Sequence, residues 1–211
     1  NTPSYTFNSS KAGTITYGGN CSSSTTSATA DNITIDFTTL SDGTYSNCSL
    51  YVTSSTGVKG NTLYVTPFTV DTTAPTANFT AATDNVGTVT GALTSGNTTD
   101  DTALVLSGTN ESGSGVKVYN GSTELGAATV SGTSWSYSAT VANGTTYQFN
   151  VKETDLAGNT SAATSNFTVI GDTTAPTANF TAATDNVGTV QGALTSGNTT
   201  DDTALVLSGT N

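Results

Sequence analysis

Short runs in which apolar and polar residues alternate recur along the whole chain, and they predict antiparallel β-strands. Alternation with a period of two over about four to eight residues, bounded by Gly, Asn and Ser, is typical of a strand with one buried face. No segment places its apolar residues at the spacing of a helix face. Within residues 1–70 the alternating positions are Ile15 and Tyr17, Ile33, Ile35 and Phe37, Leu50 and Val52, Leu63 and Val65, and Phe68 and Val70.

The middle of the chain shows the same pattern at greater length. Turn sequences such as NGS, NGT and AGN separate its candidate strands, and a series of short strands with regular turns predicts a β-sandwich. Trp135 is most simply the large core residue of this sandwich, although a surface Trp that stacks on a ligand is an alternative. The candidate strands are 76–82, 102–108, 115–119, 124–130, 134–141, 146–153 and 165–170.

One stretch of the sequence occurs twice. Residues 71–110 and 172–211 are identical except for Thr90 and Gln191, at an offset of 172 − 71 = 101 residues, about the size of one small domain. The chain therefore divides into a short sandwich (1–70), a complete sandwich (71–171) and the first two strands of a further repeat (172–211). Two strands cannot bury a face, so we expect the last segment to be disordered or paired outside the chain. We also expect the chain to be part of a longer array.

The two cysteines, Cys21 and Cys48, both lie in the first segment. A single pair in an acidic chain rich in Thr, Ser and Asn predicts a disulfide and an oxidising, extracellular setting, with two buried thiols as the alternative. The bridge closes a loop of 48 − 21 = 27 residues. Such a loop is worth on the order of 3 kcal/mol in the chain-entropy model, which matters in a segment with so thin a core.

The charge balance excludes several classes of function. Four lysines face fifteen acidic residues, so nucleic acid and anionic membrane surfaces are poor partners. No apolar run approaches the roughly 18 residues that span a bilayer, so we expect no membrane insertion. The chain has no His to serve as a general base, which argues against an enzyme, and the scarcity of His and Cys argues against zinc and copper.

The acidic residues gather in predicted loops and at the segment boundaries, where their oxygens suit Ca²⁺. Sandwich topology places Asp71 near Asp155 and Asn159, beside the turn that contains Asn110 and Glu111. The alternative is that these aspartates only begin turns and keep the surface soluble. At the opposite end of the middle segment, beside the next boundary, we expect a second group of ligands: Asp84, Asp100, Asp101 and Asp172. The repeated segment contains the counterparts of the first three, Asp185, Asp201 and Asp202.

Several motifs resemble the bacterial immunoglobulin-like repeats of large, calcium-binding surface adhesins. They include DTTAPT at 71–76, TDNVGTVTGALTSGNTTDDT at 83–102 and TDLAGNTS at 154–161. The resemblance implies tandem immunoglobulin-like β-sandwiches in a linear array, exported to the cell surface and stiffened by calcium.

The first segment resembles a shorter, disulfide-bearing relative through AGTITYGGNCSSST and LSDGTYSNCSLYV. Its VTSSTG stands where the middle segment has ETDLAG, so Ser54 or Ser55 replaces Asp155. One extra residue after Tyr45 predicts a β-bulge.

These observations favour a non-catalytic spacer in the stalk of a bacterial adhesin or extracellular fibre, with Ca²⁺ at the joints and neighbouring repeats as partners. One alternative is a filament in which the incomplete repeat is completed by strands of another copy of the chain. A second is a carbohydrate- or receptor-binding module, for which Tyr51 and Tyr119 are the candidate aromatic contacts.

Overall fold

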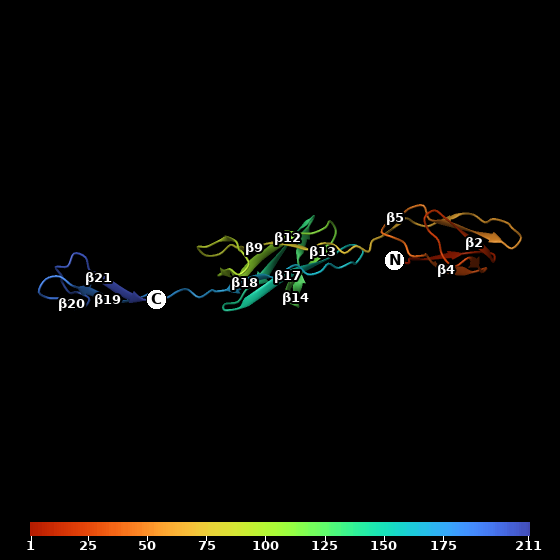
Figure 1. The fold of residues 1–211 in the computed structure, drawn as a ribbon. Coiled ribbons are helices and arrows are strands. Elements are labelled where there is room, and N and C mark those ends of the chain that lie inside the picture. The colour runs from red at the N-terminus through yellow and green to blue at the C-terminus, as the bar shows by residue number, and fades with distance from the viewer.

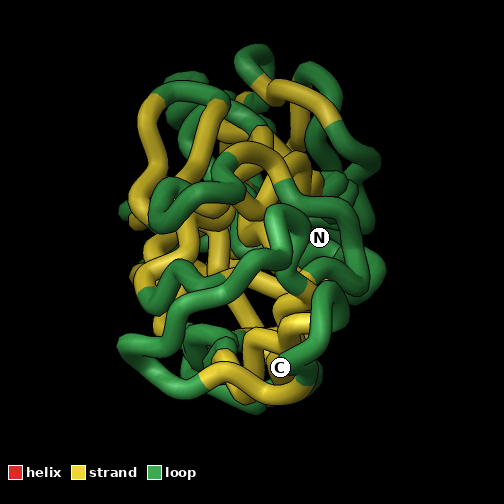
Figure 2. The backbone as a smooth tube through the Cα atoms, turned by 90° about the vertical axis from the view of Figure 1, so that its left-hand side faces the viewer, coloured by secondary structure: helices red, strands yellow, loops and turns green.

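The computed structural model describes all of residues 1–211 and consists of strands and loops. Three units follow one another in a row (Figure 1), and a view along the row shows no helix (Figure 2). The predicted all-β fold is therefore confirmed. We call residues 1–70 unit one, 71–171 unit two and 172–211 unit three. No part of the structure is a helix that could cross a membrane.

Unit one is a small sandwich of three sheets around one core. Some of the alternating positions, such as Ile15, Ile35 and Leu50, are buried, whereas others, such as Tyr17 and Val52, are only partly buried. The core also includes Phe7, from a strand that the sequence pattern did not reveal. The largest sheet has the order β3-β2-β6-β7, while β1 pairs with β4 and β5 with β8. The strands are β1 (Ser4–Asn8), β2 (Gly13–Gly18), β3 (Ser27–Ala28), β4 (Asn32–Asp36), β5 (Gly43–Tyr45), β6 (Ser49–Ser54), β7 (Leu63–Tyr64) and β8 (Phe68–Val70).

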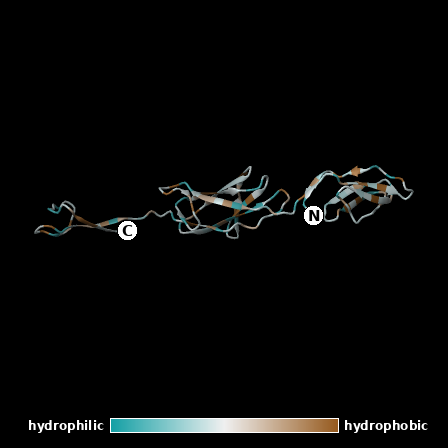
Figure 3. Ribbon diagram, turned by 45° about the horizontal axis from the view of Figure 1, so that its top comes forward, coloured by the Kyte–Doolittle hydropathy of each residue, from teal (hydrophilic) through white to brown (hydrophobic).

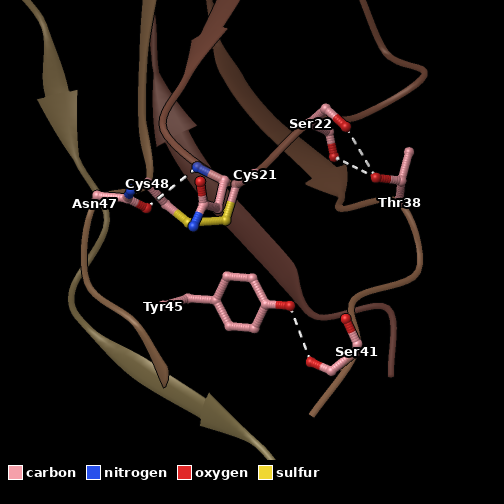
Figure 4. The surroundings of a disulfide bond; sticks show 8 residues. Cys21, Ser22, Thr38, Ser41, Tyr45, Asn47 and Cys48 are labelled. Atoms are coloured by element: carbon pink, nitrogen blue, oxygen red, sulfur yellow. Dashed lines mark hydrogen bonds between the residues drawn. A yellow bond between two sulfur atoms is a disulfide. The ribbon is translucent and has the colours of Figure 1, made fainter. Parts of the chain in front are cut away.

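The predicted disulfide links Cys21 to Cys48 across this core, with a Cα–Cα distance of 5.3 Å. Both cysteines are buried. The bridge ties the loop after β2 to the residue before β6, beside Asn47 and the Tyr45 ring (Figure 4). It therefore extends the link between β2 and β6 beyond their last paired residues, Gly18 and Ser49.

The extra residue of unit one lies in a break between β5 and β6. Tyr45 and Ser54 are 54 − 45 = 9 positions apart, whereas Tyr147 and Asp155 in unit two are 155 − 147 = 8 apart. In unit two the corresponding strand runs without interruption, so the insertion in unit one is absorbed where the strand stops pairing.

Unit two is a sandwich of two five-stranded sheets, with the orders β10-β9-β12-β16-β15 and β11-β18-β17-β13-β14. Trp135 is only 2% exposed and packs in the core against Phe79, which confirms its predicted structural role. The strands are β9 (Asn78–Asp84), β10 (Gly91–Ala92), β11 (Thr98–Thr99), β12 (Ala103–Thr109), β13 (Gly115–Asn120), β14 (Thr123–Ala127), β15 (Thr129–Ser131), β16 (Ser134–Thr140), β17 (Thr146–Thr154) and β18 (Phe167–Gly171).

The sequence pattern missed two features of unit two. The strands β10 and β11 each have two residues, which is too short to show any periodicity. The predicted strand 124–130 is in fact two strands in different sheets, because the chain passes from β14 to β15 at Ala128. Alternation shows which residues point inward, but it does not show which sheet they belong to.

Unit three contains three strands, not the two expected: β19 (Asn179–Asp185), β20 (Gly192–Leu194) and β21 (Val206–Thr210). They form a single sheet with the order β20-β19-β21, with no second layer over its apolar residues (Figure 3). Phe180 is 65% and Leu207 66% exposed, whereas Leu106, the counterpart of Leu207 in unit two, is fully buried. The unit is thus a sheet, but as expected it does not bury its apolar face.

Replacing both cysteines in Cys21→Ala/Cys48→Ala should destabilise unit one alone. The loss should be on the order of 3 kcal/mol, because the unfolded segment regains the freedom that the closed loop removed. Differential scanning calorimetry of the 1–211 chain measures this, with unit two, which contains no cysteine, as the internal reference. An unchanged transition for unit one would contradict a stabilising role for the bridge.

Candidate functional site

The linker between units one and two, residues 71–73, is hydrogen-bonded to Asp42 in the loop before β5. The Oδ1 atom of Asp42 accepts hydrogen bonds from the Thr72 backbone N–H at 3.0 Å and from the Thr72 hydroxyl at 2.7 Å. Its Oδ2 atom accepts one from the Thr73 hydroxyl at 2.7 Å. The bonds from Thr72, and then from Thr73, hold the pKa of Asp42 below its ordinary value. We call this arrangement the linker seat.

The next joint repeats the linker seat with an amide in place of the carboxylate. Asn143, in the loop before β17, accepts a hydrogen bond from the Thr173 backbone N–H at 2.8 Å and donates one to the Thr174 hydroxyl at 2.9 Å. Asn143 is 143 − 42 = 101 positions after Asp42, the same offset as the sequence repeat. The seat is therefore a feature of both joints.

Unit two holds the first linker from the other side. The Nδ2 atom of Asn159 donates a hydrogen bond to the Asp71 backbone carbonyl at 3.1 Å and another to Asp155 Oδ2 at 2.9 Å. Asp155 Oδ1 accepts from the backbone N–H groups of Ala157 and Asn159, both at 2.9 Å. These bonds, led by that from the Asn159 side chain, lower the pKa of Asp155. The structure thus brings Asp71, Asp155 and Asn159 together, as the sequence predicted.

A buried carboxylate that the sequence analysis missed lies at this end of unit two. Glu153, near the end of β17, is fully buried. Its Oε1 atom accepts hydrogen bonds from the Glu111 backbone N–H at 2.6 Å and from the Ser114 hydroxyl. Its Oε2 atom has no hydrogen-bond partner, and neither does the buried Oδ1 atom of Asn110, whose amide nitrogen contacts Ser114 at 3.5 Å.

Two unpartnered oxygens in one buried network are unusual, because a buried acceptor without a donor costs free energy. They fit a hard cation such as Ca²⁺, which binds carboxylate and amide oxygens. Glu111 was predicted as a ligand, but in the structure it is exposed, and only its backbone N–H and carbonyl join this network. The sequence did hold a signal for Glu153, because it occupies the inward-facing series of Phe149 and Val151.

We call this region the joint pole of unit two: the linker 71–73, the turn 110–114 and the loop 155–160. Nowhere in the structure do three or more His, Cys, Asp or Glu side chains gather closely enough to hold a metal ion by themselves. A cation at the joint pole would therefore need amide or backbone oxygens in addition to the carboxylates.

The opposite end of unit two, the far pole, has a different character. Asp84 and Asp101 are buried, and all four of their carboxylate oxygens accept hydrogen bonds. Asp84 accepts from the Val86 N–H and the Thr99 hydroxyl, and Asp101 from the N–H groups of Asn85 and Ala103. These aspartates therefore hold their own loop together through hydrogen bonds.

The remaining predicted residues lie around the same loop and its copy. Asp100 is exposed beside Gly87, and the Asp172 backbone N–H donates to the Thr99 carbonyl at 2.9 Å. The second joint therefore does run beside this loop. In unit three, Asp185 and Asp202 repeat the bonds of Asp84 and Asp101, and Asp201 lies beside Gly188.

Comparison with known proteins bears on unit two directly. Residues 74–173 match the family model of the bacterial Ig-like domain. The matched residues include the turn 110–114 and the loop 155–160 of the joint pole and the loop of the far pole, and they end at the second joint. No curated protein sequence matches the chain.

A solved structure of the Bacteroides ovatus mixed-linkage glucan utilization locus (MLGUL) SGBP-B, in complex with mixed-linkage heptasaccharide, aligns with the chain at 11% identity. The alignment covers 88% of this chain and 45% of that one, so the chain spans less than half of that protein. Its TM-score of 0.25 is too low to support a conclusion about the fold or ligand of the present chain.

The two linker seats should respond differently to pH. Because the pKa of Asp42 is lowered in the folded chain, its contribution is present above its ordinary pKa of about 4 and is lost as pH falls through the lowered value. Asn143 does not titrate, so the second joint should keep its seat. NMR relaxation should show independent tumbling of units one and two in the wild type at a pH well below the ordinary pKa of Asp. Asp42→Ala should show the same independent tumbling already at neutral pH.

The matched variant Asn143→Ala should loosen only the second joint, at every pH. If Asp42→Ala left the coupling between units one and two unchanged at neutral pH, the hydrogen bonds of Asp42 would not control the joint.

Proposed function

We propose that the chain is a non-catalytic spacer in the stalk of an extracellular bacterial surface protein, stiffened by Ca²⁺ at the joint pole of unit two. The match to the bacterial Ig-like domain supports a surface module. The near-identical repeat and the row of units support a role in which added length is useful. The disulfide supports an oxidising, extracellular setting.

The observation that carries the calcium proposal is the pair of unpartnered buried oxygens, Glu153 Oε2 and Asn110 Oδ1. Isolated burial of a carboxylate is costly, and a divalent cation would offset that cost. Glu153 and Asn110 would hold the ion from unit two, and amide and backbone oxygens of the joint pole, the Asp71 carbonyl among them, would complete the set of donors. When bound, Ca²⁺ supplies positive charge to a pole that is otherwise acidic.

The mechanical consequence follows from where the linker lies. Residues 71–73 are bonded to Asp42 of unit one and, through the Asp71 carbonyl, to Asn159 of unit two. Pro75 is buried and has a restricted backbone, so little slack is left in the joint. A cation shared between Asp71 and the body of unit two would restrict bending further, and neighbouring carboxylates without it would repel each other.

Calcium titration with Glu153→Gln tests the site. Wild-type chain should bind Ca²⁺ in isothermal titration calorimetry, and the variant should bind about tenfold more weakly or not at all, because ligand charge sets the affinity. In EDTA, where no Ca²⁺ is bound, the substitution should no longer be unfavourable. There the variant should melt at or above the wild-type temperature, since it no longer buries an uncompensated charge.

Glu124→Gln is the matched control. Glu124 is a surface residue paired with Lys117 at 2.9 Å, so its loss should leave calcium affinity unchanged. A wild-type chain that binds no Ca²⁺ and melts at the same temperature with and without EDTA would refute the metal site.

The stalk role predicts that calcium lengthens the chain in solution. Small-angle X-ray scattering of residues 1–211 should give a larger maximum dimension with Ca²⁺ than with EDTA, because the first joint bends less. Glu153→Gln should show the EDTA-like distribution in both conditions. Identical distance distributions for the wild type with and without calcium would contradict stiffening even if the ion binds.

A further inference from the structure

A hollow of about 430 Å³ lies at the end of unit one that faces away from unit two. Its lining residues come mainly from the loop between β1 and β2 and from the loop between β6 and β7. We call it the distal hollow. Its size falls within the range of small-ligand sites, roughly 300–1,000 Å³.

The charge of the distal hollow is opposite to that of the chain. The chain has four lysines and fifteen acidic residues, yet Lys11 and Lys59 both line this hollow and no acidic residue does. Neither lysine has an ion-pair partner, since the single salt bridge of the structure joins Lys117 and Glu124. Two uncompensated ammonium groups at one hollow favour an anionic ligand.

One of these ammonium groups is held in place by an aromatic ring. The Nζ atom of Lys59 lies 3.9 Å from the centroid of the Tyr51 ring, a cation–π contact. The ring shields one side of the ammonium from water and limits its motion. The lysine is thus partly ordered before any ligand arrives, which lowers the entropic cost of binding.

The corresponding end of unit two shows that this charge is not imposed by the fold. The β6–β7 loop has the same backbone hydrogen bonds as the loop after β17: Ser54 N–H to Val58 O at 3.0 Å matches Asp155 N–H to Asn159 O at 3.0 Å. The bridge between Thr53 and Lys59 likewise matches that between Thr154 and Thr160. Ser54 therefore occupies the position of Asp155, which settles the choice between Ser54 and Ser55.

The same comparison of backbone hydrogen bonds shows which residue of unit one stands in the place of Glu153. Gly60 N–H donates to Val52 O as Ser161 N–H does to Glu153 O, so Val52 stands in the place of the buried glutamate. Residues 71–73, which lead to unit two, leave unit one at its other end, beside Asp42. Unit one thus has the same loop backbone, with the acids replaced and Lys59 added.

We propose that the distal hollow binds a saccharide that carries a carboxylate. The ammonium groups of Lys11 and Lys59 would bind the carboxylate by charge-assisted hydrogen bonds. The amides and hydroxyls of Asn8, Asn61, Ser9 and Thr56 also line the hollow, and they suit the many hydroxyl groups of a sugar. This mixture of a few cations with neutral donors and acceptors favours a sugar acid over a purely charged ligand.

This function is independent of calcium at the joint pole. The hollow and the joint pole belong to different units and share no residue. The stalk would present the hollow, and loss of either property would leave the other intact.

NMR titration of the 1–211 chain with trigalacturonate tests the proposal, and its fully methyl-esterified form is the neutral probe. The acid form should shift backbone signals of residues 8–12 and 54–61, and the ester should bind at least about tenfold more weakly. The affinity of the acid form should fall as salt is raised, because the ammonium groups are partly exposed to solvent. No binding of the acid form, or equal binding of acid and ester, would overturn the proposal.

Matched lysine variants locate the site. Lys59→Gln should weaken binding of trigalacturonate about tenfold, whereas Lys152→Gln should not. Lys152 makes a similar contact with Tyr119 at 5.4 Å in unit two, but Tyr119 there lies beside Glu124. Equal losses from the two variants would mean unspecific attraction and would contradict the site.

Two further experiments test whether a loss of binding reflects a loss of fold, and whether the hollow recognises the sugar or only its negative charge. Ser54→Asp introduces the side chain that unit two carries on the same loop backbone, so it should keep the fold, checked by calorimetry, and abolish binding. Triglutamate should bind far more weakly than trigalacturonate. Equal affinity for the peptide would show that the hollow recognises charge alone, and would refute its assignment to a saccharide.

Discussion

The short linker at the first joint is hydrogen-bonded from both sides, and the arrangement of the units depends on this contact. Asp42 of unit one accepts hydrogen bonds from the backbone N–H and hydroxyl of Thr72 and from the hydroxyl of Thr73, while Asn159 of unit two donates one to the Asp71 carbonyl. A linker fixed at both ends has few conformations, so the orientation of one unit is passed to the next. At the second joint Asn143 provides the same seat.

The same loop position serves opposite chemistry in the two complete units. After β17 it carries Asp155 and follows the buried Glu153, and it lies against a linker. After β6 it carries Ser54 and Lys59, follows Val52, and faces a hollow. The backbone hydrogen bonds of the two loops match, so the loop is a stable frame on which side chains can be exchanged at little cost to the fold. A module of one architecture thereby lies against a linker in one place and borders an open hollow in another.

Much of the fold follows from local patterns. Runs such as Tyr147, Phe149 and Val151 predict strands because alternation fixes which side chains face the core. Asp71, Asp155 and Asn159 could be grouped in advance, since sandwich topology fixes which loops share an end. Glu153 could not be recognised as easily, because a glutamate in a strand is ordinarily exposed and only its burial with an unpartnered oxygen distinguishes it.

The repeated segment separates what sequence alone determines from what the tertiary structure decides. The loop with Asp84, Thr99 and Asp101 has the same hydrogen bonds as its copy with Asp185, Thr200 and Asp202. The bonds are the same because the bonded residues lie close to one another in the sequence. Identical sequence does not give identical burial, since Leu106 is fully buried and its counterpart Leu207 is 66% exposed. Sequence fixes hydrogen bonds between near neighbours and the inward or outward direction of a side chain. Burial, and with it the cost of an unpartnered oxygen or charge, depends on strands more distant in the chain, and only the folded sandwich brings those together.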